Sequence, residues 1–177
     1  MIKFIKYRES GNCFVNCVVQ ACKNLKDPKI INSHKPELSI FIKKTLVSDN
    51  LAGELKSALK YLLKKEYQVK IIDPEPNKNN NWGKNNLSKV IIEKRRYFKN
   101  DINRLITNNW QVVISSELND IPHAILFTKE KLYDPQNKET WSNPKNLADI
   151  HFKKYMSNNQ DRFLIAINNK DNAKEIK

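Results

Sequence analysis

The sequence predicts an α+β domain in which helices come first and an antiparallel β-sheet follows. An apolar segment with helical spacing lies near the N-terminus, and an amphipathic helical segment follows it. Several short apolar segments of strand character then stand close together in the second half of the chain. This order favours helices packed on an antiparallel sheet over alternating βαβ units. The length of 177 residues suggests one domain, covering residues 1–177.

Three helices are predicted before the first strands. The first runs from Cys13 to about Asn24, with Asn12 as its N-cap. Apolar residues surround most of it, which is typical of a buried central helix. The segment "HKPELSIFIKKTL" predicts a second helix that begins at Pro36. The segment "LAGELKSALKYLLKKEY" has leucines on one face and lysines on the other, so it predicts an amphipathic helix.

The rest of the chain alternates between strands and polar connections. "QVKIID" predicts a strand that ends at Pro74, and residues 74–86 form a long polar loop. "LSKVIIEKRRYFKNDINRLITNN" has helical spacing, and residues 144–156 predict a further helix. Four more segments predict strands, the middle two as a hairpin about "TKEK": "WQVVISSE", "HAILF", "LYDP" and "RFLIAI". A charged tail, residues 168–177, is expected to be frayed.

The composition bounds the setting of the protein and its partners. The formal net charge of +13 attracts nucleic acid, anionic lipid or an acidic protein, although lysine and asparagine spread along the whole chain also fit compositional drift. No apolar segment is long enough to span a bilayer, and the first residues lack the apolar core of a signal peptide. We therefore expect a cytoplasmic protein, with delivery into another cell as an effector as the alternative. Three closely spaced cysteines fit reduced thiols better than a disulfide framework.

Cys13 is the candidate nucleophile. It occupies the first turn of the buried helix, where free backbone amides and the helix dipole stabilise a thiolate. Its own amide is also placed to hold an oxyanion. Cys17 and Cys22 lie deeper in the same helix and lack those amides, so we interpret both as small core residues.

His123 is the candidate base and Asp134 its orienting carboxylate. His123 begins the apolar segment "HAILF", and Asp134 ends the next segment, "LYDP". A turn at Thr128–Lys129 pairs the two residues directly, and a turn shifted by one residue leaves them diagonal neighbours. The three residues then form a Cys-His-Asp triad. A metal site is weaker, because the Cys13–Cys17 spacing is unusual for zinc and a fourth ligand is missing, so we expect no metal and no cofactor.

These motifs resemble papain-like cysteine peptidases, most closely the branch of the bacteriocin-leader peptidases. The resemblance lies in Gly11-Asn12-Cys13-Phe14, in His123-Ala124-Ile125 and in Asp134-Pro135, and it covers the chain from about Gly11 to Pro135 in element order. It implies a papain-like fold with a peptide or protein substrate. It also implies a thiol hydrolase in which Cys13 attacks, His123 transfers protons and Asp134 orients the histidine.

One position departs from that family. Papain-like enzymes commonly carry a glutamine about six residues before the nucleophile as an oxyanion donor, and Tyr7 stands there instead. Tyr7 and Asn12 are the candidate side chains for this role. Losing one such donor typically costs about 10²–10³ in rate.

Other functions remain open on the same residues. "GNCF" is also similar to ovarian-tumour-type deubiquitinases, and a deamidase or acyltransferase uses the same triad. A different class is a non-enzymatic basic module that binds nucleic acid or another anion through Arg95, Arg96 and Lys99. Such a module is expected to lose affinity steeply with salt. A charged surface of this kind would also steer an acidic substrate to an enzyme.

Overall fold

The computed structural model describes residues 13–27, 51–74, 90–118, 121–135, 139–142 and 163–169. The predicted helices at 36 and 144–156 and the polar loop from residue 75 onward lie outside these ranges. The described elements are α1 (Cys13–Asn24), α4 (Leu51–Lys64), β1 (Gln68–Ile72), β2 (Val90–Glu93), α5 (Lys99–Thr107), β3 (Gln111–Leu118), β4 (Ile121–Phe127), β5 (Lys131–Asp134), β6 (Glu139–Ser142) and β7 (Leu164–Asn168).

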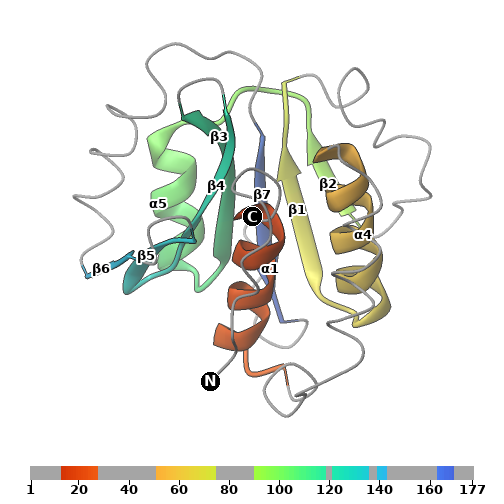
Figure 1. The fold of residues 1–177 in the computed structure, drawn as a ribbon, viewed down its shortest axis with the longest axis horizontal. Helices are drawn as coiled ribbons and strands as arrows, with labels where there is room; N and C mark the ends of the chain where they lie inside the picture. The colour runs from red at the N-terminus through yellow and green to blue at the C-terminus, as the bar shows by residue number, and fades with distance from the viewer. Residues whose placement is uncertain are drawn as a thin grey trace.

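The described strands form one mixed sheet with helices on both faces. Seven strands in these ranges pair in the order β2-β1-β7-β3-β4-β5-β6. The last strand, β7, lies between β1 and β3 and pairs antiparallel with both. Figure 1 shows α1 and α4 in front of the sheet and α5 behind it. The α+β class and the helix-on-sheet arrangement predicted from the sequence are therefore confirmed.

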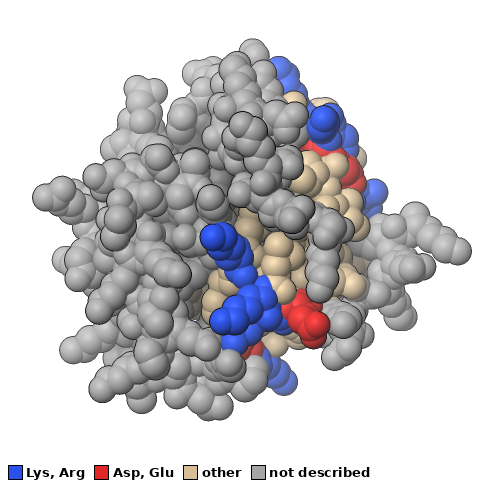
Figure 2. All heavy atoms as spheres, turned by 90° about the vertical axis from the view of Figure 1, so that its right-hand side faces the viewer, with Lys and Arg blue, Asp and Glu red and all other residues tan. Residues whose placement is uncertain are grey.

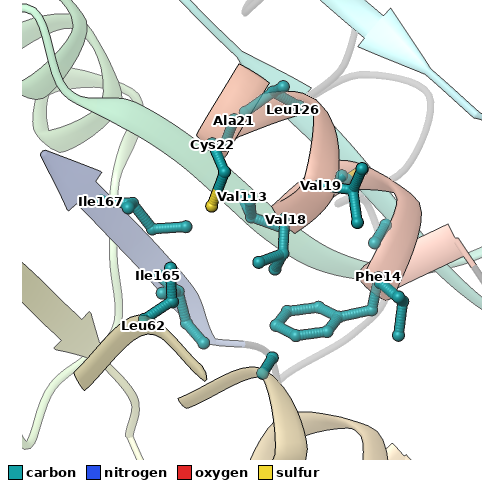
Figure 3. Close-up of a cluster of buried hydrophobic side chains, with 14 of the residues drawn as sticks. Phe14, Val18, Val19, Ala21, Cys22, Leu62, Val113, Leu126, Ile165 and Ile167 are labelled. Atoms are coloured by element: carbon teal, nitrogen blue, oxygen red, sulfur yellow. The ribbon is translucent and has the colours of Figure 1, made fainter. Parts of the chain in front are cut away.

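Each sheet face has its own apolar core, because the β-strands alternate their side chains between the faces. The larger core joins α1 and α4 to the sheet, and Figure 3 shows part of it. In β4 its members are Ala124 and Leu126. The smaller core lies under α5, and there β4 contributes Ile125 and Phe127. The sheet is therefore buried on both sides over its centre.

Helix α1 is buried for the reason that its sequence suggests. Phe14 is 2% exposed and Cys17 and Cys22 are 0% exposed, so apolar side chains are covered nearly all round. The ring of Phe14 meets that of Phe163 edge to face, with centroids 6.2 Å apart and planes at 63°. Such pairs add to the stabilisation that burial alone gives. The start of α1 is thereby fixed against the strand that follows Phe163.

The other end of α1 is closed by a left-handed residue and a buried carboxylate. Lys26 has a φ of 58°, which ends the helix and directs the chain so that the Asp27 amide donates to the Cys22 carbonyl at 3.0 Å. The Asp27 carboxylate accepts hydrogen bonds from the hydroxyls of Tyr61 (3.1 Å) and Tyr67 (2.8 Å). These bonds join the end of α1 to α4 and to the start of β1.

The prediction of the sheet was wrong at one edge, where a parallel strand takes the place of the expected helix. Residues 90–93, which we expected in a helix, form β2, and β2 runs parallel to β1. The β-branched residues of "VII" suit a strand, and the helical spacing that we counted belongs only to α5. Lys70 of β1 and Glu93 of β2 form an ion pair across this parallel edge. Strand β6 was not predicted.

The predicted frayed tail begins too early, because both Asn168 and Asn169 are held by the fold. Asn168 is the last residue of β7 and is fully buried. Asn169 donates a hydrogen bond from its side chain to the Leu25 carbonyl at 3.1 Å. The reason is the sheet register, which pairs Asn168 with Gln68 of β1.

Candidate active site

Cys13 is the first residue of α1 and lies at the edge of the larger core. Its side chain is partly exposed and packs against that core. Helix residues at this position have amides that no intrahelical carbonyl accepts. Cys13 therefore combines access to reagents with a backbone environment that favours a negative charge.

Cys17 and Cys22 are core residues, as the sequence predicted. Burial raises the pKa of Cys17 well above that of a free thiol, and the charges of Cys13 and Asp134 raise it further. Burial is also the main cause that raises the pKa of Cys22 to about 12, with the charge of Asp27 as the second. Figure 3 shows the Cys22 sulfur among apolar side chains of α1 and β7. Neither thiol is suited to act as a nucleophile.

The β4–β5 hairpin turns one residue later than the direct pairing of His123 with Asp134 requires. Leu126 pairs with Tyr133 and Phe127 with Leu132, so the turn residues are Lys129 and Glu130. The Thr128 amide donates to the Lys131 carbonyl at 2.8 Å, and the Thr128 hydroxyl oxygen accepts from the Lys131 amide at 2.9 Å. These bonds to Thr128 fix the register. The direct pairing was therefore wrong.

The observed register corresponds to the shifted alternative. Continued by one pair, it places Asp134 opposite Ile125, so His123 and Asp134 are diagonal positions on neighbouring strands. Diagonal positions are about 7–8 Å apart between Cα atoms, which long side chains can bridge. The side chain of His123 lies outside the described residues, so its contact with either partner stays a prediction.

Asp134 is fully buried at the end of β5. Its charge is one of the causes that raise the pKa of Cys17 and of Tyr133, and the charge of Cys13 acts on the same two groups. For Tyr133, burial is the largest cause. Asp134 and Cys13 are separated by 121 positions in the sequence. Both nevertheless lie within electrostatic range of the same two buried side chains, Cys17 and Tyr133. Helix α1 also contacts both β4 and β5.

Tyr133 lies near the candidate site, and the sequence analysis did not single it out. It belongs to the larger core beside α1, and its pKa responds to Cys13, Cys17 and Asp134 together. Alternation turns Tyr133 to the face opposite that of Asp134, and only the packing of α1 on that face brings it near Cys13.

The start of β4 sets a condition on the triad. Position 123 falls in the same alternation as Ile125 and Phe127, which belong to the core under α5, whereas Cys13 packs against the other core. The observed register puts Asp134 opposite Ile125, on the same α5 face as position 123. A triad with Cys13 thus requires both β4 before Ala124 and the end of β5 at Asp134 to depart from strict alternation. Pro122, which pairs with Glu117, has no amide to give to the ladder, and proline in a strand is typical of such irregular positions.

Two further predicted site residues cannot be placed. Tyr7 and Asn12, the candidate oxyanion donors, lie outside the described residues. Their roles stay predictions.

The three residues of the predicted anion-binding surface lie around the start of α5. The Arg95 guanidinium donates to Glu93 at 2.7 Å and to both Asp101 oxygens at 2.8 and 2.9 Å. Arg95 is therefore occupied within the fold. Arg96 and Lys99 also have interactions of their own. Figure 2 shows Lys and Arg atoms with Asp and Glu atoms beside them on the side of the molecule that carries β2 and α4.

Asp101 gives a pH-dependent test of this network. Hydrogen bonds from Arg95 are the main cause that lowers the pKa of Asp101, and the Phe98 amide adds to them at 2.8 Å. Because the pKa of Asp101 is lower in the folded state, its charge stabilises the protein at any pH above its pKa in the unfolded chain, about 3.9. This contribution is lost as the pH falls through the pKa of the folded state. We expect Asp101→Asn to lower the free energy of unfolding by about 1–2 kcal/mol at pH 7, since Arg95 is partly exposed.

Urea unfolding of Asp101→Asn and wild type from pH 7 to pH 3 measures this effect. The difference between the two proteins should shrink below about pH 4. Glu130→Gln, on the exposed turn, serves as the control and should show no such trend. A difference for Asp101→Asn that stays constant with pH would show that the carboxylate charge is not what Arg95 stabilises.

Two comparisons with known proteins found no match. No family model matches the chain, and no curated protein matches it. Within the ranges that the structure describes, no helix has the length and apolarity needed to cross a membrane.

Proposed function

We propose that this protein is a papain-like thiol hydrolase that cleaves a peptide or amide bond through Cys13, His123 and Asp134. The supporting observation is the position of Cys13. It is a partly exposed thiol on the first residue of a buried helix, and it acts on the same buried side chains, Cys17 and Tyr133, as the carboxylate of Asp134. A thiol that served packing alone gains nothing from the free amides of a helix start.

The chemistry follows from these positions. His123 takes the proton of the Cys13 thiol, and the sulfur forms a bond to the substrate carbonyl carbon while the carbonyl oxygen takes the negative charge. The Cys13 amide holds that oxygen. The carbon–nitrogen bond then breaks, and His123 gives its proton to the leaving amine. Water, deprotonated by His123, attacks the thioester, which releases the acid and restores the thiol.

Asp134 holds the imidazole in the orientation that this sequence requires. A buried carboxylate beside a histidine stabilises the imidazolium formed when the thiol loses its proton. The diagonal register puts the two residues on adjacent strands and on one face of the sheet, so the proposal requires both side chains to turn toward the face that carries Cys13. The resulting thiolate–imidazolium pair exists well below the pH at which a free thiol ionises.

The pH dependence of alkylation tests the proposal. The rate at which iodoacetamide modifies Cys13 should retain a plateau between about pH 5 and pH 7, because the thiolate is paired with the imidazolium. In His123→Gln the plateau should disappear and the rate should follow a free thiol, about tenfold or more slower at pH 6. Asp134→Asn should weaken the plateau without removing Cys13 from solvent.

The chain offers a matched control for the histidine. His34→Gln and His151→Gln change the two other histidines and should leave the profile unaltered. An identical profile for wild type and His123→Gln would contradict the triad. If the profile is as expected, the product separates two activities. A deamidase releases ammonia from a carboxamide substrate, whereas a peptidase releases a new peptide amine.

A further inference from the structure

A polar cavity lies at the opposite end of α1 from Cys13. Its volume is about 610 Å³, within the range of small-molecule sites, and its walls come from the end of α1, the start of β3 and the β4–β5 turn. Gln20 of its lining is seven residues from Cys13, or about 10 Å along the helix. Cys13 is not among the described lining residues, so the cavity is distinct from the nucleophile position, although Tyr133 of the larger core lines it.

A chain of side-chain amides forms one wall of this cavity. Gln20 Nε2 donates to Asn24 Oδ1 at 2.9 Å, and Asn24 Nδ2 donates to Gln111 Oε1 at 2.9 Å. Every bond runs in the same direction, so the chain ends on the Nε2 group of Gln111. Gln111 is 8% exposed and lines the cavity. Its position and its hydrogen bond to Asn24 are thus fixed by the fold.

The last amide of that hydrogen-bonded series, Gln111, has a donor group, Nε2, without an acceptor among the described residues. Among the described residues, no acceptor contacts Gln111 Nε2, and this atom is not one of the fully enclosed polar atoms that lack a partner. It therefore opens to the cavity, where a ligand oxygen can accept from it. A ligand oxygen that displaces solvent there can form a hydrogen bond with this donor.

The rim of the cavity is cationic. Among the described residues, Lys26, Lys129 and Lys131 line it together with a single carboxylate, that of Glu130. The negative end of the α1 dipole lies on the same side and offsets part of this charge. Nearby carbonyls are bonded within the fold: Cys22 O accepts from the Asp27 amide and Leu25 O from Asn169 Nδ2. The positive charge of the rim lysines and the amide donor of Gln111 both suit a negatively charged group with oxygen acceptors.

We infer that this cavity binds a small anion whose phosphate or carboxylate oxygens accept from Gln111 Nε2 while the three lysines neutralise its charge. A neutral sugar leaves the lysines unmatched, and a cation meets like charge. The volume suits a molecule of drug size, and the turn that carries Lys129 is held by the hydrogen bonds of Thr128. This inference does not depend on the proposed function.

Titration calorimetry of the full chain with pyrophosphate and with citrate, at low ionic strength, tests it. We expect saturable binding to one site for at least one of the two anions. The double variant Lys129→Ala/Lys131→Ala should weaken binding about tenfold or more, and Gln111→Glu should weaken it at least as much by placing a carboxylate at the donor position. Tighter binding of pyrophosphate assigns a phosphate ligand, and tighter binding of citrate assigns a carboxylate ligand.

Two exposed lysines outside the cavity provide the matched control. Lys23→Ala/Lys60→Ala removes the same charge from α1 and α4 and should change the affinity less than twofold. Equal weakening by both lysine pairs would show only the general field of a basic protein and would overturn the site. So would the absence of saturable binding for both anions. A thermal unfolding midpoint like that of wild type shows that the double variant is folded.

Discussion

In the native protein at pH 8, iodoacetamide should modify Cys13 at least about 10³-fold faster than Cys17 or Cys22. The thiolate is the reactive form, and Cys13 is partly exposed to the reagent. The pKa of Cys22 is raised to about 12, which leaves about one part in 10⁴ as thiolate. Cys17 and Cys22 are also 0% exposed, so access lowers their rates further.

Mass spectrometry of peptides after timed labelling measures the three rates separately. In urea all three cysteines should react at similar rates, because the burial that separates them is lost. Cys13→Ser should leave a native protein that takes up almost no label. Comparable labelling of the three thiols in the native state would show that α1 is not packed as the structure has it, and the case for Cys13 would be lost. This test depends on burial alone and not on the identity of the base.

Phe14→Ala should lower the free energy of unfolding by about 3–5 kcal/mol. The ring is 2% exposed in the larger core and meets Phe163 edge to face, so the substitution leaves a cavity and removes an aromatic pair. Denaturant unfolding with a common slope for both proteins measures the loss. The same substitution at Phe98, which is 62% exposed, should cost less than about 0.5 kcal/mol.

A double-mutant cycle separates the two parts of that cost. Phe14→Leu and Phe163→Leu together should show a coupling of about 0.5–1.5 kcal/mol, which is the aromatic contribution beyond burial. Additive losses would assign the whole effect to volume. A loss at Phe14 no larger than that at Phe98 would contradict the position of α1 on the sheet. The result also bears on Cys13, because Phe14 fixes the turn on which Cys13 lies.

Local patterns predicted the elements whose periodicity is uninterrupted. The apolar run from Cys13 gave the limits of α1, and the leucine and lysine faces gave α4, because both patterns repeat with the helical period over three turns or more. The pattern failed at residues 90–93, where four residues are too short for a strand and a helix to be told apart. Strand β2 also depends on a partner, β1, that its own sequence does not reveal.

The hairpin illustrates what limits a prediction of the site. The sequence placed His123 and Asp134 on adjacent strands, but the turn could lie at either of two positions one residue apart. The side chain of Thr128 decides between them, since its hydroxyl bonds both the amide and the carbonyl of Lys131. Register is a matter of such individual bonds and of which face is buried, and composition does not encode it.

The sequence by itself determined that this chain has an α+β fold, a buried N-terminal helix and a cysteine at the start of that helix. These follow from periodicity and from the exposure of helix ends, which are local properties. Only the tertiary structure decided that Asp134 lies within electrostatic range of the same buried pair as Cys13, that Arg95 is held by Glu93 and Asp101, and that a cationic cavity lies at the far end of α1. Each of these three features joins residues that are far apart in the sequence. Strand order and register bring such residues together, and packing across the whole sheet fixes strand order and register.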